Sequence, residues 1–421
     1  MTEATARSRM RWAAAAVAAA TLVTGLIGAG IAQADPVAKK EPAARTDWVA
    51  TWATAAEVPF SGQQLAGFTD TTLRERIHVS IGGDVVRLRL TNVYGKTPLV
   101  VQSTTLGRPG GTPGDVDAAS LVPVTFDGAT SVTIPPGAEY ASDPVRISVP
   151  GDGNLMASLY LPGPTGPATY HRDAWTTGYL AAGDQTGQPT VASFPSRISN
   201  FYFLDGLDVE STMDGSVAFL GDSITDGTHS TVDADHRWPD YLADRMLTQP
   251  RSRQFGVVNS GIAGNRLLLD YTGAGQGVNA LARLERDVLT QTGVRTVFVF
   301  EGINDLQNDP TQYDPNQFIQ AYHQIIQRAH DQGIRVVAST ITPWAGWTAW
   351  TPEREAVRVQ VNQWIRTSGE FDGVVDFDKV IRDPADPQRI LPAYDSGDHL
   401  HPGDVGYKAM ADAVNLDLLR P

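Results

Sequence analysis

Ser223 and His401 are the two residues whose types together point to a reaction. A serine hydroxyl is a weak nucleophile at neutral pH and needs a base beside it, and imidazole suits that task because it titrates near neutrality. Asp398 precedes His401 by three residues, so one short loop can present both side chains. A carboxylate there fixes the tautomer of the imidazole and stabilises its charged form. If folding brings the three together, they predict nucleophilic catalysis.

Each of these residues also has a simpler explanation. Ser223 closes the segment GDS at 221–223 after an apolar run, where it would serve equally well as a helix N-cap. The segment around Asp398 is equally typical of a polar loop before a last helix. Asp398, His399 and His401 could together bind a metal ion, but no other His-rich segment supplies further ligands. We therefore expect neither a metal nor an organic cofactor.

Two further segments could donate hydrogen bonds to a developing oxyanion. GIND at 302–305 contains Asn304, whose side-chain amide can donate, and NSGIAGN at 259–265 offers the backbone N–H of a glycine. The simpler explanations are an Asn-Asp turn and a flexible loop. A phosphate-binding loop fits less well, because the segments have neither a Walker lysine nor the G-x-G-x-x-G spacing.

The second half of the chain alternates between strand and helix patterns. Short apolar runs, typical of strands buried on both faces, occur at 217–220, 257–258, 296–300, 336–339 and 374–377. The clearest helix pattern covers 315–332, with Asp314 at the N-cap, Pro315 at the first position and Gly333 as the stop. The alternation predicts a parallel sheet with helices on both faces, and active sites form where such strands end.

Together, four segments resemble the motifs of the SGNH subgroup of the GDSL hydrolase family, in the family's order. They are GDS at 221–223, NSGIAGN at 259–265, GIND at 302–305 and DHLH at 398–401, and the resemblance covers roughly 215–421. It implies an α/β fold with an SGNH-type, flavodoxin-like parallel sheet.

The same resemblance implies a role for each motif residue. Ser223 would be the nucleophile, His401 the base and Asp398 the residue that orients His401. The oxyanion hole would combine the N–H of Ser223, the N–H of Gly264 and the amide of Asn304. Gly264 is preferred to Gly261 because the family's glycine immediately precedes a polar residue, here an asparagine.

The first half of the chain has a strand-rich pattern. Residues 47–205 contain many short alternating runs, such as VVRLRL at 85–90, separated by Gly, Pro and Asp, and no convincing helix. This predicts an antiparallel β-sandwich. The stretch from Trp48 to Tyr94 is also similar to the N-terminal β domain of secreted bacterial GDSL hydrolases, which implies a jelly-roll-like sandwich. A chain of 421 residues favours two domains, here 47–205 and 215–421.

The N-terminus and the composition bear on location. Three arginines, an apolar run and Ala32-Gln33-Ala34 indicate a signal peptide at 1–34, followed by a flexible linker at 35–46. An uncleaved membrane anchor is the alternative. Removing three Arg and one Glu changes the net charge from −14 to −16, which disfavours nucleic acid and anionic membranes as partners. The absence of cysteine excludes disulfides and thiol nucleophiles.

These observations predict a secreted, extracellular serine hydrolase that cleaves small-molecule or polymeric esters through an acyl-enzyme. The substrate would be a lipid, a short-chain acyl ester or an O-acetylated carbohydrate. Trp344, Trp347 and Trp350 crowd one loop and would bind substrate at the catalytic rim, unless they are buried. The alternatives are a catalytically silent carbohydrate-binding protein and an acyltransferase, and a monomer is the default. His229 and His236 would lie at the cleft or on the surface.

Overall fold

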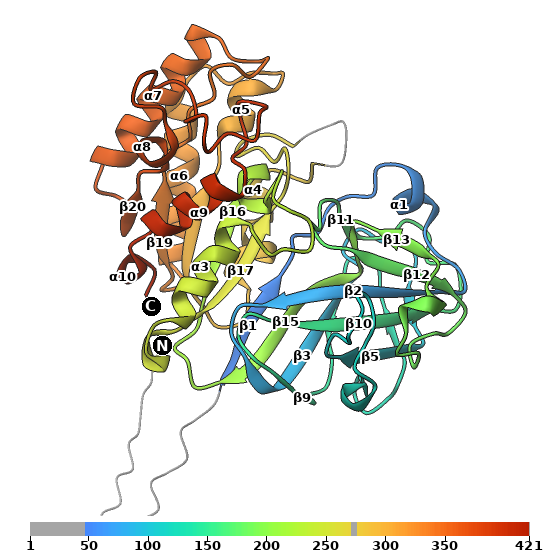
Figure 1. The fold of residues 1–421 in the computed structure, drawn as a ribbon. Helices are drawn as coiled ribbons and strands as arrows, with labels where there is room; N and C mark the ends of the chain where they lie inside the picture. Colours follow the sequence, from blue (N-terminus) through green and yellow to red (C-terminus); the bar gives the residue numbers. More distant parts are fainter. Residues whose placement is uncertain (1–46, 271–275, 421) are drawn as a thin grey trace, which may run out of the picture. The chain divides into compact units, whose positions relative to one another are not determined.

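The computed structural model describes residues 47–270 and 276–420 (Figure 1). The predicted signal peptide at 1–34 and linker at 35–46 lie outside the described residues. Among the residues that are described, no helix is long and apolar enough to cross a membrane.

A parallel sheet forms the centre of the second half. Its five strands are β16 (Ser216–Gly221), β17 (Gly256–Gly261), β18 (Val294–Phe300), β19 (Arg335–Ser339) and β20 (Gly373–Val375). They lie in the order β17-β16-β18-β19-β20, and every neighbouring pair is parallel. In chain order this is 2-1-3-4-5, the flavodoxin-like arrangement. The predicted α/β fold class is confirmed, although the last strand ends at Val375 because Asp376 caps helix α8 (Phe377–Ile381).

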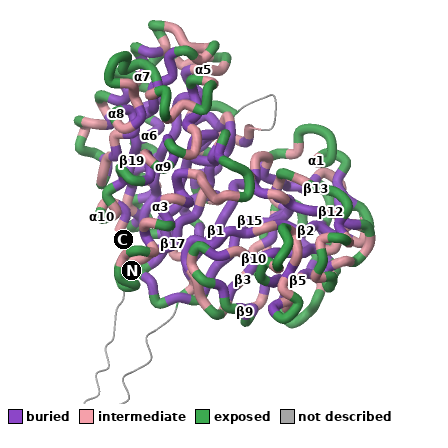
Figure 2. Tube along the Cα trace, viewed as in Figure 1, coloured by how far each residue is buried: buried purple, intermediate pink, exposed green. Residues whose placement is uncertain are grey.

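Helices cover both faces of this sheet. Side chains alternate along a strand, so Val217 and Phe219 face one helical layer while Ala218 and Leu220 face the other. The first layer contains α3 (Trp238–Leu247), α8 and α9 (Asp404–Ala413), and the second contains α4 (Ala280–Leu284), α6 (Pro315–His330) and α7 (Pro352–Thr367). Figure 2 shows the strands between them as buried.

Helix α6 begins as the sequence predicts. Asp314 is its N-cap, with the carboxylate accepting from the N–H of Asn316 at 2.9 Å, and Pro315 occupies the first position. The helix ends at His330, two residues earlier than expected, and Gly333 follows with a left-handed φ of 70°.

The two larger antiparallel sheets of the first half enclose a hydrophobic core, and two two-stranded sheets, β4 (Leu99–Val101) with β7 (Val132–Ile134) and β11 (Tyr170–His171) with β14 (Phe201–Tyr202), complete this region. One sheet contains β1 (Asp47–Ala53), β15 (Leu204–Ser211), β3 (Gly83–Thr91), β8 (Glu139–Ala141) and β9 (Val145–Val149). The other contains β13 (Ser196–Ile198), β12 (Gly178–Ala182), β2 (Thr71–Val79), β10 (Gly153–Leu161), β5 (Ser103–Gly107) and β6 (Val122–Pro123). Leu73 and Leu159 from one sheet meet Leu88 and Leu207 from the other in this core.

This arrangement confirms the predicted β-sandwich and adds three short helices that the sequence did not indicate: α1 (Gly62–Ala66) and two 3-10 helices, η1 (Ala118–Ser120) and η2 (Val191–Ser193). The sandwich also extends to the end of β15 at Ser211, beyond the expected limit of 205. The division of the chain into domains at 47–205 and 215–421, and the jelly-roll connectivity, stay predictions.

The β-sandwich packs against the edge of the parallel sheet. The N–H of Val257, on the edge strand β17, donates to the hydroxyl of Ser80 at 2.9 Å. The N–H of Ala50, on β1, donates to the carbonyl of Thr292 at 2.9 Å, and Ala50 itself lies in the core of the α/β region. Both contacts lie near the amino ends of the parallel strands, since β17 begins at Gly256 and β18 at Val294.

Candidate active site

Ser223 lies at the tight turn that follows β16. Asp222 is the N-cap of the short helix α2 (Ser223–Asp226), and its carboxylate accepts from the N–H of Ile224 at 3.0 Å. Gly221 must be glycine, because a Cβ there would lie 2.2 Å from the hydroxyl of Thr225. Since Asp222 caps the helix, the alternative explanation of Ser223 as an N-cap is wrong. Ser223 instead occupies the first helical position.

The structure brings Ser223, His401 and Asp398 into one hydrogen-bonded line. The Ser223 Oγ is 2.8 Å from the His401 Nε2, and the His401 Nδ1 is 2.6 Å from the Asp398 Oδ2. Ser223 and His401 are both buried. The two groups are 178 residues apart in the chain, and they meet because the loop before α9 lies over the end of β16.

Asp398 is held as a carboxylate. Burial raises its pKa, but hydrogen bonds from the His401 ring and from the N–H groups of Leu400 and His401 outweigh burial and hold the pKa well below its usual value. An ionised carboxylate only accepts hydrogen bonds, so the Nδ1 of His401 carries the proton. The Nε2 lone pair therefore faces the Ser223 hydroxyl, as a general base requires.

The three proposed oxyanion donors line one open cavity of about 270 Å³ together with His401. Among the described residues, the N–H groups of Ser223 and Gly264 have no hydrogen-bond acceptor. The Nδ2 of Asn304 is also buried without a partner in the described part of the chain, while its Oδ1 accepts from the amide of Gln307. Gly261 donates its N–H to Asn259 at 2.8 Å, so the geometry favours Gly264 as the glycine donor.

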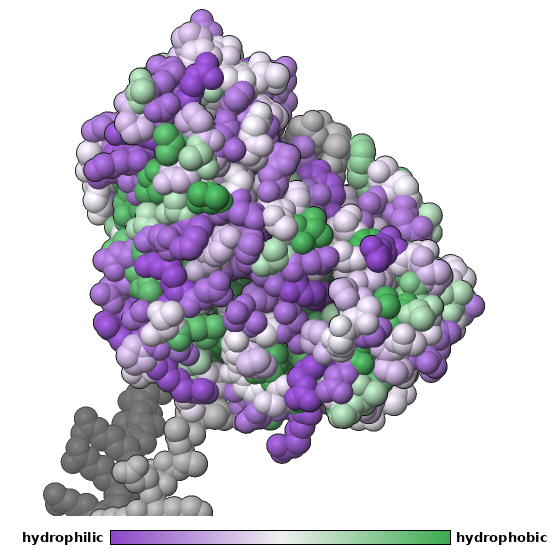
Figure 3. All heavy atoms as spheres, in the orientation of Figure 1, coloured by the Kyte–Doolittle hydropathy of each residue, from purple (hydrophilic) through white to green (hydrophobic). Residues whose placement is uncertain are grey.

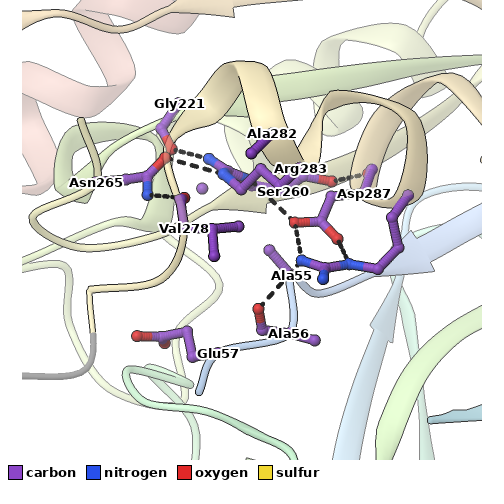
Figure 4. A network of polar contacts seen from close by, with 12 residues as sticks. Ala55, Ala56, Glu57, Gly221, Ser260, Asn265, Val278, Ala282, Arg283 and Asp287 are labelled. Carbon is purple, nitrogen blue, oxygen red and sulfur yellow. Dashed lines mark hydrogen bonds and ion pairs between the residues drawn. The ribbon is translucent and has the colours of Figure 1, made fainter. Parts of the chain in front are cut away.

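A buried arginine that the sequence analysis missed supports these segments. Figure 4 shows Arg283 extending from α4 toward the ends of two strands. Its guanidinium donates to the carbonyls of Gly221 at 2.9 Å and Ser260 at 2.6 Å, and to the side chain of Asn265 at 2.9 Å. One cation therefore joins the nucleophile strand, β17 and the loop that carries Gly264. The only sequence signal was a lone Arg in an otherwise apolar helical stretch, ALARL.

The tryptophan prediction needs a correction. Trp344 is fully buried, and its Nε1 donates to Glu355 at 3.2 Å, so it cannot present a ring to substrate. It is buried because the loop after β19 continues into the core beneath α7. Trp347 is partly exposed, lines the cavity and lies edge-on to the His401 ring, 6.2 Å between centroids. Trp350 is partly buried against the same core and does not line the cavity.

Each of the remaining histidines near the site contacts a carboxylate. The Nε2 of His229 is 3.2 Å from the Asp398 Oδ2, so this carboxylate oxygen faces two imidazoles. His236 pairs with Asp404, and His399 pairs with Asp395 at 2.6 Å. The cluster whose atoms could together approach a metal ion is thus His229, Asp398 and His401, and His399 is not part of it.

The β-sandwich region also contributes to the site, which the sequence analysis did not anticipate. Arg172 and Asp173 line the cavity, and the preceding His171 is buried with Glu57 beside it. Burial raises the pKa of Glu57 to about 7. Burial lowers the pKa of His171, but neighbouring carboxylates, Asp226 first, raise it in sum to about 9. The signal in the sequence was the run of ionisable residues HRD at 171–173.

Comparison with known proteins identifies the α/β region. The model of the GDSL-like lipase/acylhydrolase family matches residues 219–409. This part of the chain belongs to the GDSL-like lipase/acylhydrolase family. The matched range includes Ser223, Gly264, Asn304, Asp398 and His401, and membership makes the protein a carboxylic ester hydrolase.

The solved structures that are similar to this chain share little sequence identity with it. A putative lipolytic protein of the G-D-S-L family from Desulfitobacterium hafniense DCB-2 is 20% identical, with 48% of this chain and 99% of that chain covered and a TM-score of 0.37. A family two carbohydrate esterase from Cellvibrio japonicus is 12% identical, with 89% and 99% covered and a TM-score of 0.37. The acetyl xylan esterase AlAXEase is 21% identical, with 47% and 96% covered and a TM-score of 0.36. The comparison with curated proteins gave no match.

Proposed function

We propose that the protein hydrolyses esters through an acyl-enzyme, with Ser223 as nucleophile and His401 as general base. The observation that carries this proposal is the 2.8 Å contact between the Ser223 Oγ and the His401 Nε2. The hydroxyl oxygen attacks the ester carbonyl carbon while the Nε2 takes its proton. Asp398 keeps the imidazole in the accepting tautomer and stabilises the imidazolium that forms.

The negative charge of the tetrahedral intermediate would be stabilised by fixed donors. The N–H groups of Ser223 and Gly264 and the Nδ2 of Asn304 line the cavity, and none of these three has a hydrogen-bond acceptor among the described residues, so the oxyanion would accept from all three. Collapse breaks the bond to the alcohol oxygen, which takes the proton from His401. Water then attacks the acyl-enzyme, His401 accepts its proton, and the acid and Ser223 are released.

The cavity favours a short acyl group on a polar alcohol. Polar side chains predominate in its lining: Arg172, Asp173, Thr228, Gln276, Gln307 and Asn308. A long acyl chain would need an extended apolar channel, whereas Trp347 offers a ring face on which a sugar can stack. On the face shown in Figure 3, the hydrophobic residues that the structure describes form small separate groups among hydrophilic ones.

We therefore propose O-acetylated carbohydrates and other short-chain esters as the substrate class. The signal-like sequence at 1–34 supports action outside the cell, where such polymers are found.

Replacing the nucleophile tests the mechanism. We expect Ser223→Ala to lose at least about 10⁴-fold in kcat, because the residual rate would come from binding and oxyanion donors alone. The thermal transition should stay within a few degrees of wild type. Ser230→Ala is a matched control, since this buried serine of the next turn does not line the cavity. A Ser223→Ala protein with near wild-type turnover would contradict the proposal.

A series of p-nitrophenyl esters, together with acetylated xylan, tests the substrate class. We expect kcat/KM to be highest for acetate and to fall as the acyl chain lengthens. An increase toward long chains would favour lipids instead. Product analysis with an added alcohol separates hydrolysis from acyl transfer.

A further inference from the structure

We propose that Arg172, on the β-sandwich side of the cavity, is a positioning residue for the oxyanion donor Gly264. The inference rests on the proposed function, since it concerns how one of the proposed donors is aimed. It gives the β-sandwich region a direct part in catalysis.

Arg172 holds the peptide unit that carries the donor. Its Nη2 donates to the carbonyl oxygen of Ala263 at 3.0 Å. That carbonyl and the N–H of Gly264 belong to the same peptide unit, which is planar, so in the trans form they point in opposite directions. Fixing the oxygen therefore fixes the direction of the N–H, and both Arg172 and Gly264 line the cavity. A cationic donor on the oxygen also polarises the peptide and strengthens its N–H as a donor.

The peptide unit before Ala263 is held from the other side. The N–H of Ala263 donates to the Asp226 Oδ2 at 3.1 Å, and the Asp226 Oδ1 is 3.0 Å from the Nε2 of His171. The Nδ1 of His171 is 2.9 Å from the carbonyl of Ala55. A carbonyl and a carboxylate only accept, so both ring nitrogens carry protons and His171 is a buried cation. Adjacent residues of the sandwich, 171 and 172, thus hold both peptide units that flank Ala263.

Arg172 is itself fixed by neighbours. Its backbone N–H donates to the Glu57 Oε1 at 2.7 Å, and its Nε donates to the Asp173 Oδ2 at 2.9 Å. Gly264, in contrast, has a left-handed φ of 79° and no side chain to pack. Contacts from outside the loop therefore help to order it, and Arg172 is the residue whose side chain donates to the carbonyl of the peptide unit that carries the donor.

The test compares Arg172→Gln and Arg172→Lys with wild type in two assays. One is steady-state hydrolysis of p-nitrophenyl acetate. The other is the rate at which a p-nitrophenyl phosphonate labels Ser223, followed by intact mass, because its phosphoryl oxygen also develops charge in the oxyanion hole. For the Gln variant we expect kcat to fall about 10–100-fold, less than for loss of a donor. KM should change less than about twofold, and labelling should slow by the same factor as kcat. The Lys variant should recover part of both rates.

Arg76→Gln is the matched control. Arg76 also lies in the β-sandwich and pairs with Asp235 of the α/β region, with Nη1 to Oδ1 at 2.9 Å, but it does not line the cavity. It should leave kcat and the labelling rate within about twofold of wild type, as expected for an ion pair away from the reacting atoms.

Three outcomes would overturn the inference. The first is an Arg172→Gln variant whose kcat and labelling rate are unchanged. The second is an Arg172→Gln variant in which only KM rises, which would mean that Arg172 contacts substrate. The third is an Arg76→Gln variant that loses as much kcat and labelling rate as Arg172→Gln. If Arg172→Gln does not fold, Arg172→Lys alone still tests the inference. A lysine variant with wild-type kcat and labelling rate would show that the guanidinium geometry is not needed, and would contradict the inference. Labelling of wild type but not of Ser223→Ala tests the proposed function separately, whatever the Arg172 variants do.

Discussion

At the scale of single residues, the two oxygens of Asp398 have different partners. Oδ1 accepts from the backbone N–H groups of Leu400 and His401, at 2.9 and 2.8 Å, whereas Oδ2 faces the imidazoles of His401 and His229. The backbone contacts fix the loop, and the imidazole contacts set the tautomer. A substitution that keeps the two backbone hydrogen bonds but changes the hydrogen bond to His401 would therefore alter the tautomer of the imidazole without disturbing the loop.

Asp398→Asn is such a substitution. The amide oxygen can keep the two backbone contacts, but its NH₂ group then faces the Nδ1 of His401 and forces that nitrogen to accept. The proton moves to Nε2, which can no longer accept from Ser223. We expect kcat to fall about 10³–10⁴-fold with little change in the thermal transition. Asp395→Asn, which alters the contact to His399 in the same loop, should lose far less activity.

Trp347 is the one tryptophan of the loop that reaches the cavity. Trp347→Ala should raise KM for acetylated xylan several-fold, because a stacking face for the sugar is lost. KM for p-nitrophenyl acetate should change little. Trp350→Ala, from the same loop but outside the cavity lining, is the control. An equal effect of Trp347→Ala on both substrates would argue against a sugar platform.

At the scale of elements, one buried cation joins three segments of the site. Arg283 contacts the end of β16, the end of β17 and the loop before α4, and its guanidinium lies 3.4 Å from carboxylate oxygens of both Asp287 and Glu301. Removing it would leave buried carbonyls and carboxylates without their donor. Such losses are costly, because the stranded groups remain out of water.

Arg283→Met should therefore destabilise the protein by about 3–5 kcal/mol. Denaturant unfolding at pH 7 measures this directly. Arg253→Met is a suitable comparison, since Arg253 pairs with Asp417 at the exposed surface. Such a pair is worth about 0–1 kcal/mol. Equal midpoints for the two variants would show that the buried network contributes little.

Element positions were largely predictable, because each depends on local pattern. Apolar runs located the parallel strands, and Asp314 with Pro315 located the start of α6. The motif residues were predictable from the resemblance of four short segments to the SGNH motifs, and the position of those segments at strand ends, which meet at one sheet edge, agreed with it. The burial of Trp344 was not, since a Trp-rich loop has no periodicity that distinguishes core from rim. The proposed role of Arg172 was not predictable from the sequence either, because it depends on how the β-sandwich packs beside the loop that carries Gly264.

At the scale of the whole molecule, buried ionisable groups make stability depend on pH. Burial raises the pKa values of Glu57 and Asp222 to about 7, so the folded state retains protons that the unfolded state releases above about pH 4–4.5. The contribution of His171 is fully present below its ordinary pKa of 6.5 and is lost as pH rises through about 9. Both effects lower the free energy of unfolding as pH increases.

We therefore expect the melting temperature to be highest near pH 5 and to fall between about pH 5 and 9. Calorimetry at constant ionic strength checks the trend. Glu57→Gln, a neutral replacement of similar shape, should flatten the part of the curve below pH 7. A melting temperature that rises from pH 5 to 8 would be inconsistent with these groups controlling stability.

The packing of the β-sandwich against β17 has a practical consequence for shortening the chain. Strand β17 is one of the two edge strands of the parallel sheet, and Ser80 and Ala50 lie against it. A fragment starting near residue 215 would lack the β-sandwich and would expose β17, with the apolar side chains behind it, to solvent. An exposed edge strand can pair with strands of other molecules. Such a fragment should therefore precipitate or form oligomers rather than yield a minimal enzyme.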